Sequence, residues 1–119
     1  MNNNYLNKND KNAISEGINA LGTISDSVKM TVKALKHFQN KNLRPNLKKY
    51  NMLKSNLKGM TELHNKNCND LENFAKFLIF CGDISEDEFS RTLRIIENHR
   101  NAYLDFKRSQ PSYIRKLMY

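Results

Sequence analysis

Residues 50–81 read YNMLKSNLKGMTELHNKNCNDLENFAKFLIFC, and this stretch decides the fold. Residues suited to a core recur in it at steps of three and four. They are Tyr50, Leu53, Leu57, Met60, His64, then Asn67 or Cys68, Leu71, Phe74, Leu78 and Cys81. Such spacing is typical of a helix that buries one face, and its unbroken phase predicts one helix over about residues 46–81. The Asn-rich segment 64–70 is a poor helix former, so a break near residues 65–69 is an equal alternative.

The preceding segment has the same spacing and predicts a first helix over about residues 10–40. Its apolar residues are Ile14, Ile18, Leu21, Ile24, Val28, Val32, Leu35 and Phe38. Asp10 or Asn9 is placed to cap it, and Gly22 inside it costs about 1 kcal/mol relative to alanine. Residues 1–9 are expected to be a disordered polar arm. Pro45 favours a turn over residues 40–46.

The third helix has the clearest local signal. Gly82 and Asp83 end the preceding helix, and Ser85 with Glu88 forms a capping box. Ile84 and Phe89 are spaced for a hydrophobic staple around that box. This helix is expected to end near Arg108, before Pro111, and residues 112–119 predict a short amphipathic turn. The fold class is therefore all-α: an elongated antiparallel bundle of three long helices, or four if the second breaks, in one domain over residues 10–119.

Composition supports a helical protein that does not cross a membrane. The 119 residues include only four Gly and two Pro, and no apolar run approaches the roughly 20 residues that span a bilayer. The polar N-terminus lacks a signal region, and two cysteines make no disulfide framework, so a cytoplasmic location is expected. The 18 Asn residues suggest an AT-rich genome, such as that of a low-GC bacterium, its phage or a plasmid. For a phage protein, the compartment would be the host cytoplasm.

Charge is distributed very unevenly along the chain. No acidic residue lies between Asp26 and Glu62, and the net charge of residues 27–61 is +9 in a chain of +8. The cations of this acid-free segment are Lys29, Lys33, Lys36, Lys41, Arg44, Lys48, Lys49, Lys54 and Lys58. A block of one sign creates a directional field and points to an anionic partner.

A helical hairpin would gather this block at one end of the bundle. If the second helix is continuous, the third helix returns to that end and adds Lys107, Arg108, Arg115 and Lys116. The opposite end, at the turn of residues 82–88, would be acidic. The helix dipole alone favours lysines in a last helical turn, but it does not explain Lys48 and Lys49, which lie in a first turn.

No residue set predicts catalysis, a metal site or a cofactor. His64 and Cys68 have i, i+4 spacing that suits two zinc ligands, and Cys81 and His99 would have to complete the set. Core positions explain both cysteines better. Cys81 with His99 is also a poor nucleophile pair, because a helix C-terminus raises the pKa of a thiol. The acids at 86–88 are explained by helix capping.

Two further features bear on partners. Phe77, Ile79 and Phe80 belong to a segment that is apolar almost all round, so it serves either the core or a protein interface. The phase of the second helix would also serve a homo-oligomeric coiled coil. Aromatic residues interleave with cations near the turn, a weak indication of single-strand binding, because Phe38 and Tyr50 are on the predicted core phase.

These patterns lead to two hypotheses about function. The first is a non-enzymatic protein that contacts the phosphates of nucleic acid with the basic end. The second is a small adaptor or inhibitor from a phage or mobile element that binds a host protein or a nucleoprotein machine. Binding to an acidic membrane surface ranks last, because the helices are expected to pack against one another.

Overall fold

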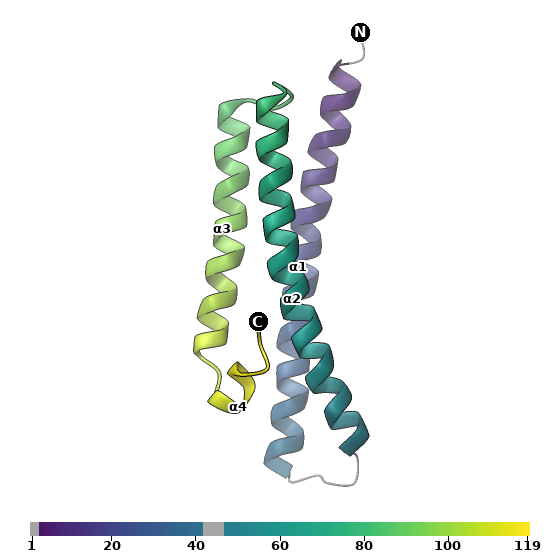
Figure 1. The fold of residues 1–119 in the computed structure, drawn as a ribbon, viewed down its shortest axis with the longest axis vertical. Coiled ribbons are helices and arrows are strands. Elements are labelled where there is room, and N and C mark those ends of the chain that lie inside the picture. Colours follow the sequence, from purple (N-terminus) through teal and green to yellow (C-terminus); the bar gives the residue numbers. More distant parts are fainter. Residues whose placement is uncertain (1–2, 42–46) are drawn as a thin grey trace.

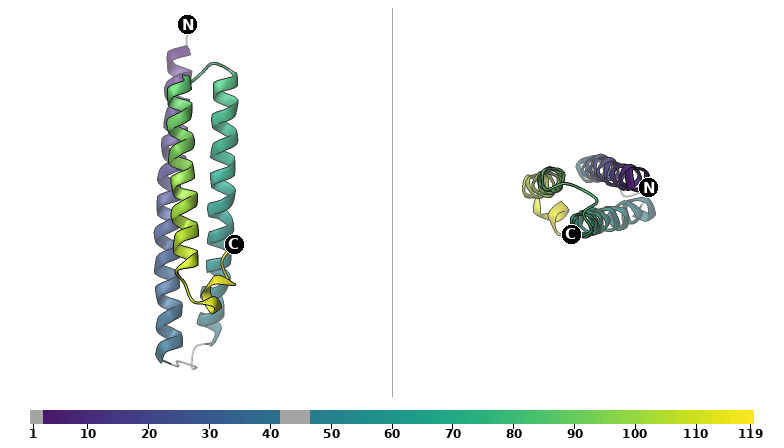
Figure 2. Two further views of the ribbon diagram at one scale, coloured as in Figure 1. Left: turned by 90° about the vertical axis from the view of Figure 1, so that its left-hand side faces the viewer. Right: turned by 90° about the horizontal axis from the view of Figure 1, so that it is seen from above.

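The computed structural model describes residues 3–41 and 47–119, with side chains described for residues 9–39 and 47–119. The helices are α1 (Asn3–Lys41), α2 (Leu47–Phe80), α3 (Glu86–Arg108) and α4 (Ser112–Arg115). Three long antiparallel helices form a rod of 63 × 24 × 15 Å, with the short α4 beside its lower half (Figures 1 and 2). The predicted all-α elongated bundle with a short C-terminal helical turn is confirmed.

The second helix is continuous. It runs for 34 residues without a break near 65–69, so the three-helix alternative is the correct one. Two buried side chains, His64 and Cys68, carry the core face through the Asn-rich segment. Its polar residues also have partners: Lys66 pairs with Asp70 at 2.8 Å, and the Asn69 side-chain oxygen accepts a hydrogen bond from Arg100 on α3. Tertiary packing thus outweighs the low helix propensity of asparagine.

The first helix is longer than predicted. It begins at Asn3, seven residues before the start expected at residue 10. No Gly or Pro lies between Asn3 and Asp10, so nothing in the sequence stops the helix upstream of the expected cap. The expected division into an arm, residues 1–9, and a domain, residues 10–119, stays a prediction. The predicted turn around Pro45 falls on residues 42–46, outside the described part.

The turn between α2 and α3 has the predicted local structure. Gly82 has a φ of 76°, and it and Asp83 donate backbone hydrogen bonds to Ile79 and Leu78, which is a Schellman motif. The capping box of α3 is also confirmed: the Ser85 hydroxyl accepts from the Glu88 N–H, and the Glu88 carboxylate accepts from the Ser85 N–H, each at 3.1 Å. This turn reverses the chain so that α3 packs antiparallel to α2.

The core consists of three layers stacked along the rod. The layer nearest the α2–α3 turn contains Ile14, Leu78 and Ile84, and the middle layer contains Leu21, Cys68, Leu71 and Ile96. The lowest layer is formed differently, because α1 and α2 extend beyond the end of α3 (Figure 1). Here Ile114 and Met118 from the C-terminal segment fill the core against Val28, Val32, Leu35 and Leu57. The C-terminal segment therefore completes this layer together with Tyr103 and Phe106 near the end of α3.

Hydrogen bonds fix the C-terminal segment in place. The Tyr119 N–H donates to the Thr61 hydroxyl on α2 at 2.9 Å. The Tyr119 main-chain oxygen accepts from the Tyr103 hydroxyl at 2.6 Å and from the Lys107 ammonium at 3.1 Å, both on α3. The segment thus joins α2 to α3 at the level where α3 ends.

Three glycines in helix interiors give a stability prediction. A methyl group on Gly22 or Gly59 would meet no neighbouring atom within 4 Å, whereas one on Gly17 would collide with the side chain of Leu71. We expect Gly22→Ala and Gly59→Ala each to raise the unfolding free energy by about 0.5–1 kcal/mol, since alanine restores helix propensity. Gly17→Ala should gain less than either, because buried Leu71 must move. Urea denaturation of the three variants measures this, and equal gains would show that Leu71 adjusts freely.

Candidate functional site

The cations predicted to converge do lie together. Continuous α2 sends α3 back into the half of the rod where α1 ends and α2 begins, although α1 and α2 extend further than α3 (Figure 1). We call the described cations of this half the basic end. They are Lys29, Lys33, Lys36, Lys48, Lys49, Lys54, Lys58, Lys107, Arg108, Arg115 and Lys116. The side chains of Lys41 and Arg44, expected at the centre of the patch, fall outside the described residues.

The cations of α1 and α2 flank the C-terminal segment from two sides. Lys29 Nζ lies 5.9 Å from the centre of the Phe106 ring, so the first residue of the lysine stripe 29–33–36 borders the end of α3. On α2, Lys54, Lys58 and Thr61 have i, i+4, i+7 spacing and so lie along one stripe of the helix. The Thr61 hydroxyl in this stripe accepts the hydrogen bond from the Tyr119 N–H. The cations of α3 and α4 lie between these two stripes.

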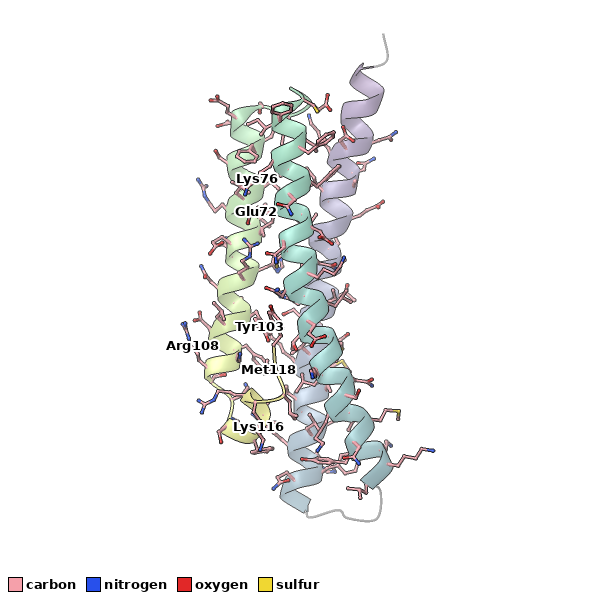
Figure 3. All side chains as sticks on the ribbon, viewed as in Figure 1. Glu72, Lys76, Tyr103, Arg108, Lys116 and Met118 are labelled. Atoms are coloured by element: carbon pink, nitrogen blue, oxygen red, sulfur yellow. The ribbon has the colours of Figure 1, made fainter. Side chains whose placement is uncertain are left out.

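Figure 3 shows the direction of two of those intervening cations. Arg108 and Lys116 project outward from the lower half of the rod, whereas Tyr103 and Met118 point between α3 and α2. Arg108, Arg115 and Lys116 are exposed, and Lys107 is partly buried beside the Tyr119 main chain. The basic end thus presents exposed cations from four helices.

Ion pairing differs sharply between the two halves of the molecule. Among the described residues, the basic end has one ion pair, between Arg108 and Asp105, and it is long at 3.9 Å. Outside the basic end, four of the six described cations pair with acids at 2.6–3.0 Å: Lys11, Lys66, Lys76 and Arg100. The charge of the basic end is therefore almost uncompensated within the chain, which leaves it available to an external anion.

The aromatic residues near the basic end are mostly packed. Phe38 and Tyr50 meet edge to face with ring centres 6.3 Å apart, as their core phase predicted. Tyr103, Phe106 and Tyr113 are also partly buried against the lowest core layer. Among the described residues of this half, only the rings of His37 and Tyr119 are exposed.

The opposite end is acidic, as predicted. Asp83, Glu86, Asp87 and Glu88 lie in the α2–α3 turn and the first turn of α3. Glu88 is bound by the Lys11 ammonium of α1 at 2.8 Å and by the Ser85 N–H, and these contacts lower the pKa of its carboxyl to about 2. Capping and this ion pair account for the position of Glu88 without a catalytic role.

Two of the three residues proposed for a protein interface are on the surface. Phe77 is 59% exposed and Phe80 is 89% exposed, one turn apart at the acidic end. Ile79 instead packs against the core layer of Ile14, Leu78 and Ile84. Most residues on the core face of α2, which could have formed an intermolecular coiled coil, pack within the chain instead. Self-association through α2 would therefore use the other face of the helix, and it stays a prediction.

The histidine and cysteine residues do not gather into a metal site. Cys68 Sγ lies 4.0 Å from His64 Nδ1, but the described residues contain no group of three or more potential ligands of the His, Cys, Asp and Glu types. Burial raises the pKa of the Cys68 thiol, which favours the protonated form over a nucleophilic thiolate. Cys81 was expected on the core face but is exposed, because it lies beyond the last residue of α2.

One interaction network was not predicted from the sequence. Arg100 on α3 donates to the Glu72 carboxylate at 2.6 Å and to the Asn69 side-chain oxygen at 2.8 Å, both on α2. Lys76 also pairs with Glu72 at 3.0 Å. Helix phase shows which residues face the core, but it does not give the vertical register of α2 against α3. It therefore cannot tell which cation of α3 lies opposite which acid of α2, and no sequence signal identified this network.

His64 gives a prediction about pH. It is 2% exposed, stacks on Tyr103 with ring centres 5.2 Å apart, and its Nε2 has no hydrogen-bond partner within the described part of the protein. Burial, and to a lesser extent the nearby His99, lower its pKa below 6.5. The unfolded chain therefore binds this proton more readily, so stability should fall as the pH drops through about 6.5 towards the lowered folded value.

The matching experiment compares unfolding free energies at about pH 7.5 and 5.5. We expect His64→Phe to lose less stability on acidification than the wild-type chain, because the ring stays but the proton site is gone. His37→Gln, at an exposed histidine, should keep the wild-type pH dependence. An unchanged pH dependence in His64→Phe would contradict the assignment to His64.

No helix in the described part of the chain is long and apolar enough to cross a membrane. Comparison of the sequence with protein-family models, and of the chain with curated proteins and solved structures, gave no match.

Proposed function

We propose that the protein is a non-enzymatic nucleic-acid-binding protein that contacts phosphates with its basic end. The observation that carries the proposal is the contrast in ion pairing. Eleven described cations lie in one half with a single long ion pair, whereas most cations elsewhere are neutralised by acids. Lysine clusters of this kind bind phosphate rows and release condensed counterions, which gives affinity with little sequence dependence.

Helix dipoles alone do not account for this arrangement. They favour cations in the last turn of α3, where Lys107 and Arg108 lie. They disfavour Lys48 and Lys49 in the first turn of α2, and they have no effect on Lys54 and Lys58 further along that helix. Binding to an external anion explains all of these positions together.

A salt titration tests the proposal. Binding of labelled DNA and RNA, followed by fluorescence anisotropy, should weaken steeply as salt rises from about 50 to 200 mM. If about six phosphates are contacted, the slope of log K against log salt should be near −5 for a duplex. Absence of binding at about 50 mM salt, or an affinity that does not change with salt, would refute the proposal.

The acidic end supports a second candidate function, binding of a protein partner as an adaptor or inhibitor. Phe77 and Phe80 are both exposed near the end of α2, and Asp83, Glu86 and Asp87 follow in the α2–α3 turn and the first turn of α3. Exposed apolar groups rimmed by charge commonly mark protein interfaces, and the acids would favour a partner surface with cations around an apolar pocket. After nuclease treatment, the wild-type chain should retain a host protein that Phe77→Asn/Phe80→Asn loses. Leu63→Asn, at an exposed α2 position, should retain it.

A further inference from the structure

Resting on the proposed function, we infer that the ligand of the basic end is a double-stranded nucleic acid, recognised by its phosphate rows and not by its bases. Duplex DNA and duplex RNA both present two antiparallel rows of phosphates, and these rows are what the basic end would recognise. Three observations lead to this inference: the width of the basic end, the position of two of its lysines, and the burial of nearby aromatic rings.

The basic end as a whole is too broad to enter a groove. The rod is 24 × 15 Å in cross-section, and the hairpin at the basic end consists of two helices side by side. Each helix with its side chains is about 10–12 Å across, and the major groove of B-form DNA is about 12 Å wide. The hairpin pair therefore cannot lie inside a groove, but it can rest across the phosphates on both sides of one.

The lysines are also placed for backbone contact. A reading helix presents its side chains from an exposed crest that can sink into the major groove. Here Lys29 lies at the seam between α1 and α3, with its Nζ 5.9 Å from the centre of the Phe106 ring. Lys54 is partly buried, with its Nζ 5.3 Å from the centre of the Tyr50 ring on the same helix. The position of these two lysines along aromatic rings favours contact with phosphates over insertion among base edges.

The chain lacks a series of stacking platforms for single strands. Proteins that bind single strands stack successive bases on exposed rings, each worth about 1–3 kcal/mol. Five aromatic residues of this half are partly buried, and the sequence of residues 40–46 includes no aromatic residue. The exposed rings of His37 and Tyr119 belong to different elements, at the end of α1 and in the C-terminal segment. Without stacking, affinity for nucleic acid depends on charge alone. A duplex has a higher phosphate density than a single strand, so charge favours the duplex.

The test compares labelled duplex DNA, duplex RNA and oligo(dT) of equal length at about 50 mM salt, using the full chain. We expect at least one duplex to bind about tenfold more tightly than oligo(dT), and the two duplex arms identify which double helix is preferred. Duplexes of only A·T or only G·C pairs should compete within about threefold of one another, since bases are not read.

Two variants check the stacking argument. His37→Ala and Tyr119→Ala should change the affinity for oligo(dT) and duplex by less than about twofold, because the main-chain contacts of Tyr119 remain. Oligo(dT) binding as tightly as a duplex, a tenfold loss in either variant, or a tenfold sequence preference would overturn the inference while leaving the proposed function standing. Failure to bind any of the three nucleic acids would overturn both.

Discussion

Replacing Ile114 by alanine is expected to reduce the free energy of unfolding by about 3 kcal/mol. Ile114 comes from a four-residue helix, yet it is fully buried against Val28, Val32, Leu35 and Leu57. The neighbouring aromatic side chains of α3, Tyr103 and Phe106, are already packed against this layer, so they cannot fill the space that the isoleucine leaves without losing their own contacts. The resulting cavity lies among residues of three helices, so the loss should be cooperative and visible as a lower urea midpoint.

The matched control is Arg115→Ala, which removes an exposed side chain from the next position of the same short helix. We expect it to change the stability by less than about 0.5 kcal/mol. A similarly small effect of Ile114→Ala would show that α4 docks on a bundle that is already stable without it. A second variant, Met118→Ala, should follow Ile114→Ala, because Met118 is buried in the same core layer.

The sequence predicted the helices better than it predicted their contacts. Hydrophobic phase and the capping box located α3 to within a residue, since both signals are local. Whether α2 continues past residue 65 depends on partners remote in sequence, such as Arg100 for Asn69. Its continuity could not be settled from propensity, because asparagine is a poor helix former until tertiary contacts compensate.

The same distinction applies to the candidate site. The acid-free segment and the antiparallel topology predicted where the cations would gather, because charge and connectivity are both written in the sequence. Their lack of acidic partners was not predictable, since pairing depends on the vertical register of the helices. Cys81 was misjudged at the end of α2, where the Schellman turn ends the helical phase that the prediction extended.

Reversing two charges of the basic end should weaken nucleic-acid binding by about 30-fold or more at low salt. Lys33→Glu/Lys58→Glu alters two exposed lysines, one in each flanking stripe, neither of which has an acidic partner within the described residues. Each reversal removes a phosphate contact and adds a repulsion, at roughly 1 kcal/mol per contact in water. The salt slope should also become shallower by about 1.8, which corresponds to two lost phosphate contacts.

The control must change the net charge equally without touching the basic end. Arg91→Glu/Arg94→Glu does so on the exposed surface of α3, in the half nearer the acidic end, and both double variants take the chain from +8 to about +4. If binding depends on the local cluster, this control should lose only a few-fold in affinity and keep the wild-type salt slope. Equal losses in the two variants would mean that net charge alone drives association, and that the basic end is no defined site. Helical circular dichroism of both variants should be unchanged, because none of the four side chains is in the core.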